Sequence, residues 1–92
     1  MTGFPVHVNR DHYTGTNSGR REKQRRYTEV AAICERYLNH RIVADPANRQ
    51  TYLYPYIADD LDLDVEEARR VLFSVDCGHN GLTVLKDPTQ PW

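Results

Sequence analysis

The chain has 92 residues, of which 39% are hydrophobic and 27% charged, a balance typical of one small globular domain and not of a disordered or fibrous protein. No stretch approaches the roughly 18–20 apolar residues of a membrane span, and the N-terminus lacks the pattern of a signal peptide. We therefore expect a cytoplasmic domain that makes no membrane contact. Its two cysteines, Cys34 and Cys77, are too few for a disulfide framework, so we expect free thiols.

The formal net charge of −1 conceals an asymmetry along the chain. Residues 1–50 hold nine Lys or Arg against five Asp or Glu, a net charge of +4. Residues 51–92 hold three against eight, a net charge of −5. This polarity indicates a basic surface that meets an anionic partner, or a self-complementary surface for dimerisation.

Residues 1–19 are expected to form a short strand and a polar arm. Phe4 to Val8 has the brief apolar alternation of a strand. Asn9 to Gly19 is polar and contains Gly, Ser and Asn, which is typical of a flexible arm.

A long first helix is predicted from Arg20, with Ser18 as its N-cap. Apolar residues recur there at the three- and four-residue spacing of one helical face: Tyr27, Val30, Ala31, Cys34, Tyr37, Leu38 and Ile42. Asp45-Pro46 ends this helix, because proline lacks a backbone donor and restricts the residue before it. Ala47 to Thr51 is then expected to be a loop.

A second, shorter helix is predicted from Tyr52 to Leu61. Pro55 falls in its first turn, where the missing N–H has little effect. The stripe expected to be buried comprises Leu53, Tyr56, Ile57 and Leu61. Asp62-Leu63 is the turn that follows.

The third helix is expected to begin at Asp64, which has the N-cap to N3 spacing of a capping box with Glu67. It should end near Cys77-Gly78, because Gly78 can adopt the left-handed conformation of a helix C-terminus. Leu82 to Lys86 is the clearest strand pattern in the chain, and residues 87–92, with two prolines, are expected to be an irregular tail.

The segment Ile57 to Leu72 resembles the helix-turn-helix of bacterial winged-helix regulators. Two helices joined by a tight turn cross at a steep angle, which a small residue, Ala58, allows, while apolar side chains fill the wedge: Leu61, Leu63, Ala68 and Leu72. The later run through Val75 and Gly81-Leu82 resembles a recognition helix that turns into the first wing strand. The resemblance extends over residues 27–86.

This resemblance implies a mainly α fold with a small β element, in which residues 20–86 form a three-helix winged helix-turn-helix-like domain. Asp62 stands where such families usually place glycine, and Asp tolerates the left-handed region better than most residues. A full wing needs a second strand, for which residues 87–92 are a poor candidate. Either the wing is truncated, or Leu82–Lys86 pairs with Phe4–Val8.

The same resemblance implies a small regulator of transcription that binds double-stranded DNA as a dimer. Helix 3, about Val65–Cys77, would enter the major groove, where Arg69 and Arg70 could reach base edges or phosphates. Lys86 would add a wing contact. A basic cluster at the start of helix 1 could contact phosphates: Arg20, Arg21, Lys23, Arg25 and Arg26. Glu66 and Glu67 count against this interpretation, because phosphates repel them.

The alternative is a protein-interaction module on the same scaffold that binds no nucleic acid. Residues two apart on a helix point in different directions, so Tyr52, Tyr54 and Tyr56 cannot all face one core. An exposed tyrosine is a common interface anchor, and we assign Tyr52 and Tyr54 to an interface with a second copy or another protein. Tyr56 has at least an equal claim to the core.

We expect neither catalysis nor a bound metal or other cofactor. Cys77-x-His79 places two potential ligands close together, but the spacing of the histidines and cysteines matches no strong zinc pattern. No glycine-rich phosphate loop is present, and the carboxylates between Asp59 and Glu67 are more typical of a solvated helix face than of acid–base catalysis. The chain is therefore predicted not to be an enzyme.

Overall fold

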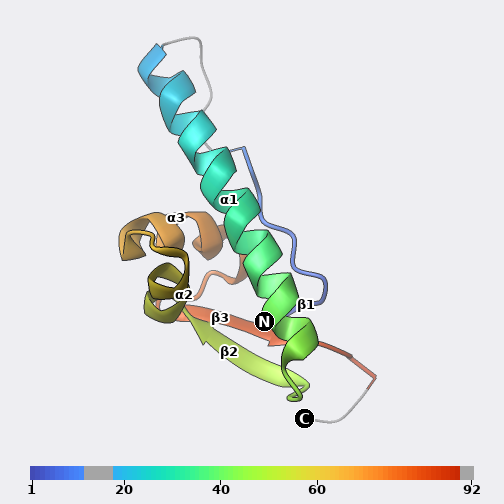
Figure 1. The fold of residues 1–92 in the computed structure, drawn as a ribbon. Coiled ribbons are helices and arrows are strands. Elements are labelled where there is room, and N and C mark those ends of the chain that lie inside the picture. The colour runs from blue at the N-terminus through green and yellow to red at the C-terminus, as the bar shows by residue number, and fades with distance from the viewer. Residues whose placement is uncertain (12–17, 90–92) are drawn as a thin grey trace.

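The computed structural model describes residues 1–11 and 18–89 and has a mainly helical fold with a small sheet (Figure 1). In chain order the elements are β1 (Thr2–Gly3), α1 (Ser18–Ala44), β2 (Arg49–Leu53), α2 (Tyr54–Leu61), α3 (Val65–Asp76) and β3 (Gly81–Leu85). Parts of the predicted arm and tail, residues 12–17 and 90–92, lie outside the described residues. No described helix has both the length and the apolar character needed to cross a membrane.

The long first helix is confirmed, and it begins at Ser18. Six of the seven residues on its predicted apolar face are buried, and Tyr37 is half-buried. The other sides of the helix are mainly polar, although Val43 near its C-terminal end is exposed, so a single stripe packs on the core. The N-terminal turns extend beyond the rest of the protein (Figure 1), and the protein as a whole measures 48 × 24 × 21 Å.

The predicted loop at residues 47–51 is wrong, because Arg49–Leu53 forms strand β2, antiparallel to β3. Only Tyr52 is buried in this strand, so the apolar alternation that reveals a half-buried strand is missing from its sequence. The second helix consequently begins at Tyr54, and Pro55 lies in its first turn as predicted.

The predicted buried stripe of α2 is wrong in two of its members. Leu53 and Tyr56 are exposed, whereas Ile57 is buried together with Tyr54 and Ala58. Leu53 lies outside the helix, and the buried face within it is formed by Tyr54, Ile57 and Ala58, which are three and four residues apart.

The turn between α2 and α3 has the predicted local geometry. Asp62 adopts a left-handed conformation with φ 55°, and the Asp64 side chain caps α3 by accepting a hydrogen bond from the Glu66 N–H at 2.8 Å. The α3 helix buries Ala68, Val71 and Leu72. The helix ends where it was predicted to end, but Cys77 and not Gly78 takes the left-handed conformation at its C-cap, with φ 53°.

The sheet has the order β1-β3-β2, with the predicted strand β3 at its centre. β1 pairs with β3 in parallel through Thr2 and Gly3, so an N-terminal strand does pair with β3. The strand predicted at Phe4–Val8 is displaced, because Val6 and Val8 contribute to the core without joining the sheet. Residues 86–89 form no strand, so within the described residues no second wing strand follows β3.

Residues Val6 to Arg10, here called the strap, lie alongside α1 (Figure 1). The backbone of Val6 exchanges two hydrogen bonds with the Asn39 side chain, at 2.7 and 2.9 Å. The Val8 N–H donates to Glu35 at 2.9 Å, and Thr28 donates to the Arg10 carbonyl at 3.1 Å. Side chains of one helix face thus satisfy a backbone that has no strand partner.

The strap should detach more readily in acid. The Val8 N–H, followed by the charge of Arg10, lowers the pKa of Glu35. The ionised Glu35 carboxylate therefore stabilises the folded protein at pH values above its ordinary pKa, and this contribution is lost as the pH falls through the lowered pKa. In urea titrations between about pH 5 and pH 3, Glu35→Gln should lose less stability than the wild type. Equal losses in the two proteins would contradict this role for Glu35.

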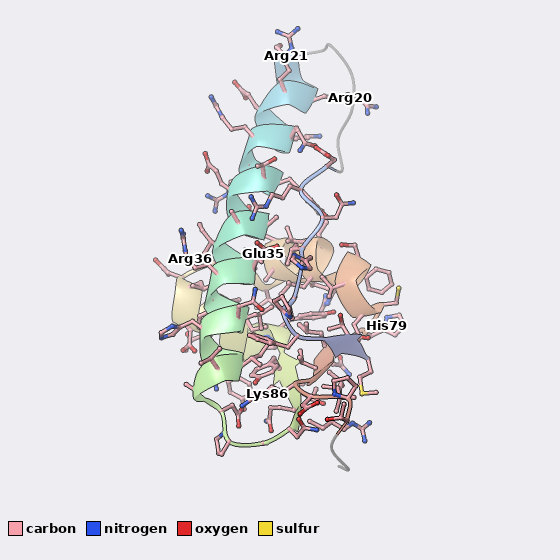
Figure 2. All side chains as sticks on the ribbon, turned by 90° about the vertical axis from the view of Figure 1, so that its right-hand side faces the viewer. Arg20, Arg21, Glu35, Arg36, His79 and Lys86 are labelled. Carbon is pink, nitrogen blue, oxygen red and sulfur yellow. The ribbon has the colours of Figure 1, made fainter. Side chains whose placement is uncertain are left out.

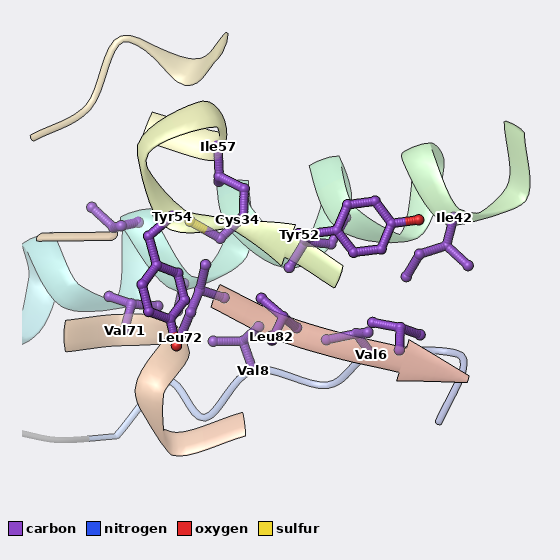
Figure 3. Packing of buried hydrophobic residues seen from close by; sticks show 14 of the residues in the cluster. Val6, Val8, Cys34, Ile42, Tyr52, Tyr54, Ile57, Val71, Leu72 and Leu82 are labelled. Carbon is purple, nitrogen blue, oxygen red and sulfur yellow. The ribbon is translucent and has the colours of Figure 1, made fainter. Parts of the chain in front are cut away.

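The core lies between α1, the inner face of the sheet and α2–α3 (Figure 3). Its largest fully buried side chains include Tyr54, Leu38, Ile42, Ile57, Leu72 and Leu82. Both thiols are free, as expected: Cys34 lies in the core and Cys77 is exposed. Burial raises the pKa of Cys34 to about 11, so this thiol is protonated at neutral pH.

Candidate nucleic-acid interface

An ion pair joins α1 to α3 at the point where the first helix leaves the body of the protein. The Arg26 guanidinium donates to both Glu67 carboxylate oxygens, at 2.9 and 3.0 Å. Those hydrogen bonds and the charge of Glu67 raise the pKa of Arg26. Glu67, predicted to complete the capping box of α3, thus instead holds the basic start of α1 against α3.

A pocket of about 350 Å³ lies at this junction. Lys23 and Arg26 from α1 and Arg70 from α3 line it, together with Tyr27, Glu67 and Val71. Three cations and one carboxylate leave a formal charge of +2. Two of the predicted basic groups, far apart in the sequence, therefore meet at one place on the surface.

The cluster at the start of α1 continues this positive charge away from the body. We call Arg20, Arg21, Lys23, Arg25 and Arg26 the basic ridge, and all five side chains are exposed. Arg20 and Arg21 lie at the projecting end of the helix (Figure 2). Arg20, Lys23 and Arg26 are three residues apart, so they share one side of the helix that leads to the pocket.

Arg69 and Arg70, predicted to act together, lie in different surroundings. The Arg69 guanidinium forms an ion pair with Glu66 and donates to the carbonyl oxygen of His79 at 3.3 Å. Arg70 is more exposed and belongs to the pocket beside the ridge. Of the two, Arg70 is thus better placed to act with α1.

Lys86 does not lie near the other predicted DNA contacts. Its ammonium group donates to the carbonyl oxygen of Asp45, at the end of α1. In Figure 2 it lies at the opposite end of the molecule from Arg20 and Arg21. Lys86 therefore does not share one surface with the ridge. The wing contact expected for it stays a prediction.

The two tyrosines assigned to an interface are buried, and the third is exposed. Tyr52 is 6% exposed and Tyr54 0%, whereas Tyr56 is 66% exposed. The prediction placed all three on one helix, but Tyr52 belongs to β2. Burial and the nearby Asp45 raise the pKa of Tyr52 to about 12, while the Tyr54 hydroxyl donates to the Gly78 carbonyl at 2.5 Å.

The sequence contained no local signal for the Arg26–Glu67 contact, since 41 residues separate its members. Within the described residues, no group of three His, Cys, Asp or Glu side chains could hold a metal ion. The sequence matches no family model, and neither a curated protein nor a solved structure shows significant similarity to it.

Proposed function

We propose that this protein binds double-stranded DNA through the basic ridge of α1 and Arg70 of α3. The observation that carries the proposal is the meeting of cations from two helices in the pocket that joins Lys23, Arg26 and Arg70. Each phosphate of the duplex carries a negative charge, and neutralising several of them releases counterions and drives binding. The exposed ridge carries five cationic side chains, of which Arg26 is already paired with Glu67.

The order of elements supports a winged-helix architecture with a truncated wing. A helix, a strand, a helix-turn-helix and a second strand follow one another as α1, β2, α2, α3 and β3. In such proteins the second helix of the helix-turn-helix faces the major groove. We extend the proposal to a transcriptional regulator that uses α3 in this way, with Arg70 beside the bases or the backbone.

The acidic residues favour one orientation on the duplex. Asp59, Asp60, Asp62 and Asp64 lie on α2 and the turn that follows it, and all four are exposed. Phosphates repel these groups, so α2 should face away from the DNA backbone. An orientation with the ridge and the pocket toward the duplex avoids this repulsion.

The test is binding of a random DNA duplex, followed by fluorescence anisotropy at about 50 and about 200 mM salt. Arg20→Gln with Lys23→Gln should weaken binding at least about tenfold and make the affinity less dependent on salt. Arg36→Gln removes one positive charge from an exposed position outside the ridge, and the single variant Arg20→Gln is its charge-matched counterpart in the ridge. The DNA affinity of the Arg36→Gln control variant should fall less than about threefold, because salt screens an exposed charge that lies more than a Debye length from the DNA.

Arg70→Ala should also weaken binding, and by more than Arg69→Ala, because Arg70 lines the pocket beside the ridge and Arg69 does not. Circular dichroism would show that each variant retains its helices. Absence of binding by the wild type at the lower salt concentration would refute the proposal and favour the protein-interaction module. Equal losses in the ridge variant and its control would remove the ridge as the binding surface.

A further inference from the structure

Strand β2 forms one edge of the sheet, because β3 pairs with it on one side only. The Lys86 N–H donates to the Asn48 carbonyl at 2.7 Å, and the Tyr54 N–H donates to the Asn80 carbonyl at 3.0 Å. These two bonds, one beyond each end of β2, establish which residues of the strand direct their backbone groups toward β3. Gln50 and Tyr52 therefore direct their backbone groups toward β3, and Thr51 and Leu53 direct theirs outward. The edge thus presents backbone donors and acceptors to a further strand.

The surroundings of this edge are suited to a protein partner. A groove of about 380 Å³ follows β2 and is bordered by Tyr56 and Asp60 of α2 and by Arg41 of α1. Tyr56 and Leu53 are exposed beside it. Proline and lysine, two residues that commonly protect an edge strand from pairing, are absent from Arg49–Leu53.

We propose that a second copy of this chain binds here, with the two β2 strands antiparallel and a two-fold axis at Thr51. The two three-stranded sheets would then form one continuous sheet. In this register Thr51 pairs with Thr51 of the second copy, and Arg49 pairs with Leu53 of the second copy. Outward-facing residues meet only outward-facing residues, so the edge is complementary to itself.

Exposed apolar surface favours the same occupant. Leu53 is 39% exposed and Tyr56 66% exposed, and both lie beside the edge. In the proposed pairing these two side chains of each copy lose exposed apolar surface. The edge lies far from the projecting end of α1 (Figure 1), so dimerisation leaves the ridge accessible and is independent of DNA binding.

Thr51→Pro tests the pairing directly. Proline removes the outward N–H, while the ladder bonds of Gln50 and Tyr52 to β3 remain. In sedimentation equilibrium the wild type should have twice the monomer mass of 10.7 kDa, and Thr51→Pro should weaken association at least about tenfold. Thr51→Val is the matched control, since it also loses the hydroxyl contact with Thr83 but keeps the N–H, and it should remain a dimer.

Cross-linking covers the case in which Thr51→Pro does not fold. A directly opposed, hydrogen-bonded pair has Cα atoms about 5.5 Å apart, within disulfide reach. With Cys77→Ser in the background, Thr51→Cys should form a covalent dimer on mild oxidation, and Thr83→Cys on the central strand should not. A monomeric wild type, a dimeric Thr51→Pro variant, or equal cross-linking at both positions would overturn the proposal.

Discussion

Replacing Tyr54 with alanine should destabilise the protein by about 3–5 kcal/mol, the usual effect of removing a buried aromatic side chain. Tyr54 is completely buried in the core, where α2 meets the loop after α3. A domain of this size has a total stability of only about 5–10 kcal/mol. The variant should therefore have a much lower midpoint in urea denaturation at neutral pH.

Two further variants separate the contributions of Tyr54 and test the placement of the tyrosines. Tyr54→Phe removes only the hydrogen bond to the Gly78 carbonyl and should destabilise by about 1–2 kcal/mol. Tyr56→Ala alters an exposed side chain and should change stability by less than about 0.5 kcal/mol in the monomer. If Tyr56→Ala were as destabilising as Tyr54→Ala, the assignment of Tyr54 to the core and Tyr56 to the surface would be wrong.

Gly81→Ala is expected to destabilise by about 2–3 kcal/mol, because a side chain there collides with the neighbouring strand. A Cβ atom at Gly81 would lie 2.4 Å from the Tyr52 carbonyl oxygen and 2.9 Å from Leu53 Cα. Both atoms belong to the backbone of β2, so relief requires the two strands to separate locally. Thermal unfolding followed by circular dichroism would measure the loss.

Gly3→Ala is the matched control for Gly81→Ala. It adds the same methyl group to the other edge strand, where nothing lies within 4 Å of the new atom. Its stability should stay within about 0.5 kcal/mol of the wild type. A similar loss in both variants would indicate that the alanine substitution itself, and not the collision with β2, is destabilising.

The features predicted correctly depend on residues close together in the sequence. The apolar spacing of α1, the Asp64 cap and the left-handed Asp62 each involve residues within about one or two helical turns. Pro55 in the first turn of α2 is of the same kind. Such features are encoded locally, because the groups that satisfy one another are covalently near.

The errors occur where a distant segment decides the local structure. Arg49–Leu53 is a strand because β3, about 30 residues later, supplies its hydrogen bonds. Its own sequence, with one buried residue, contains little strand signal. The assignment of Tyr52 and Tyr54 to an interface failed for the same reason, since the strand-to-helix boundary at Leu53 determines which way each tyrosine points.

The sequence by itself determined the three helices, the turn between the last two, the central strand and the cluster of cations at the start of α1. Only the tertiary structure decided that β2 is a strand, that the strap packs on α1, and that Arg70 lies beside Lys23 and Arg26. It also separated Lys86 from the ridge. The physical reason is that helices and caps depend on contacts within a few residues. Strand pairing instead joins residues that are from 28 (Leu53 and Gly81) to 82 (Thr2 and Val84) positions apart, and the cations of the pocket come from α1 and α3.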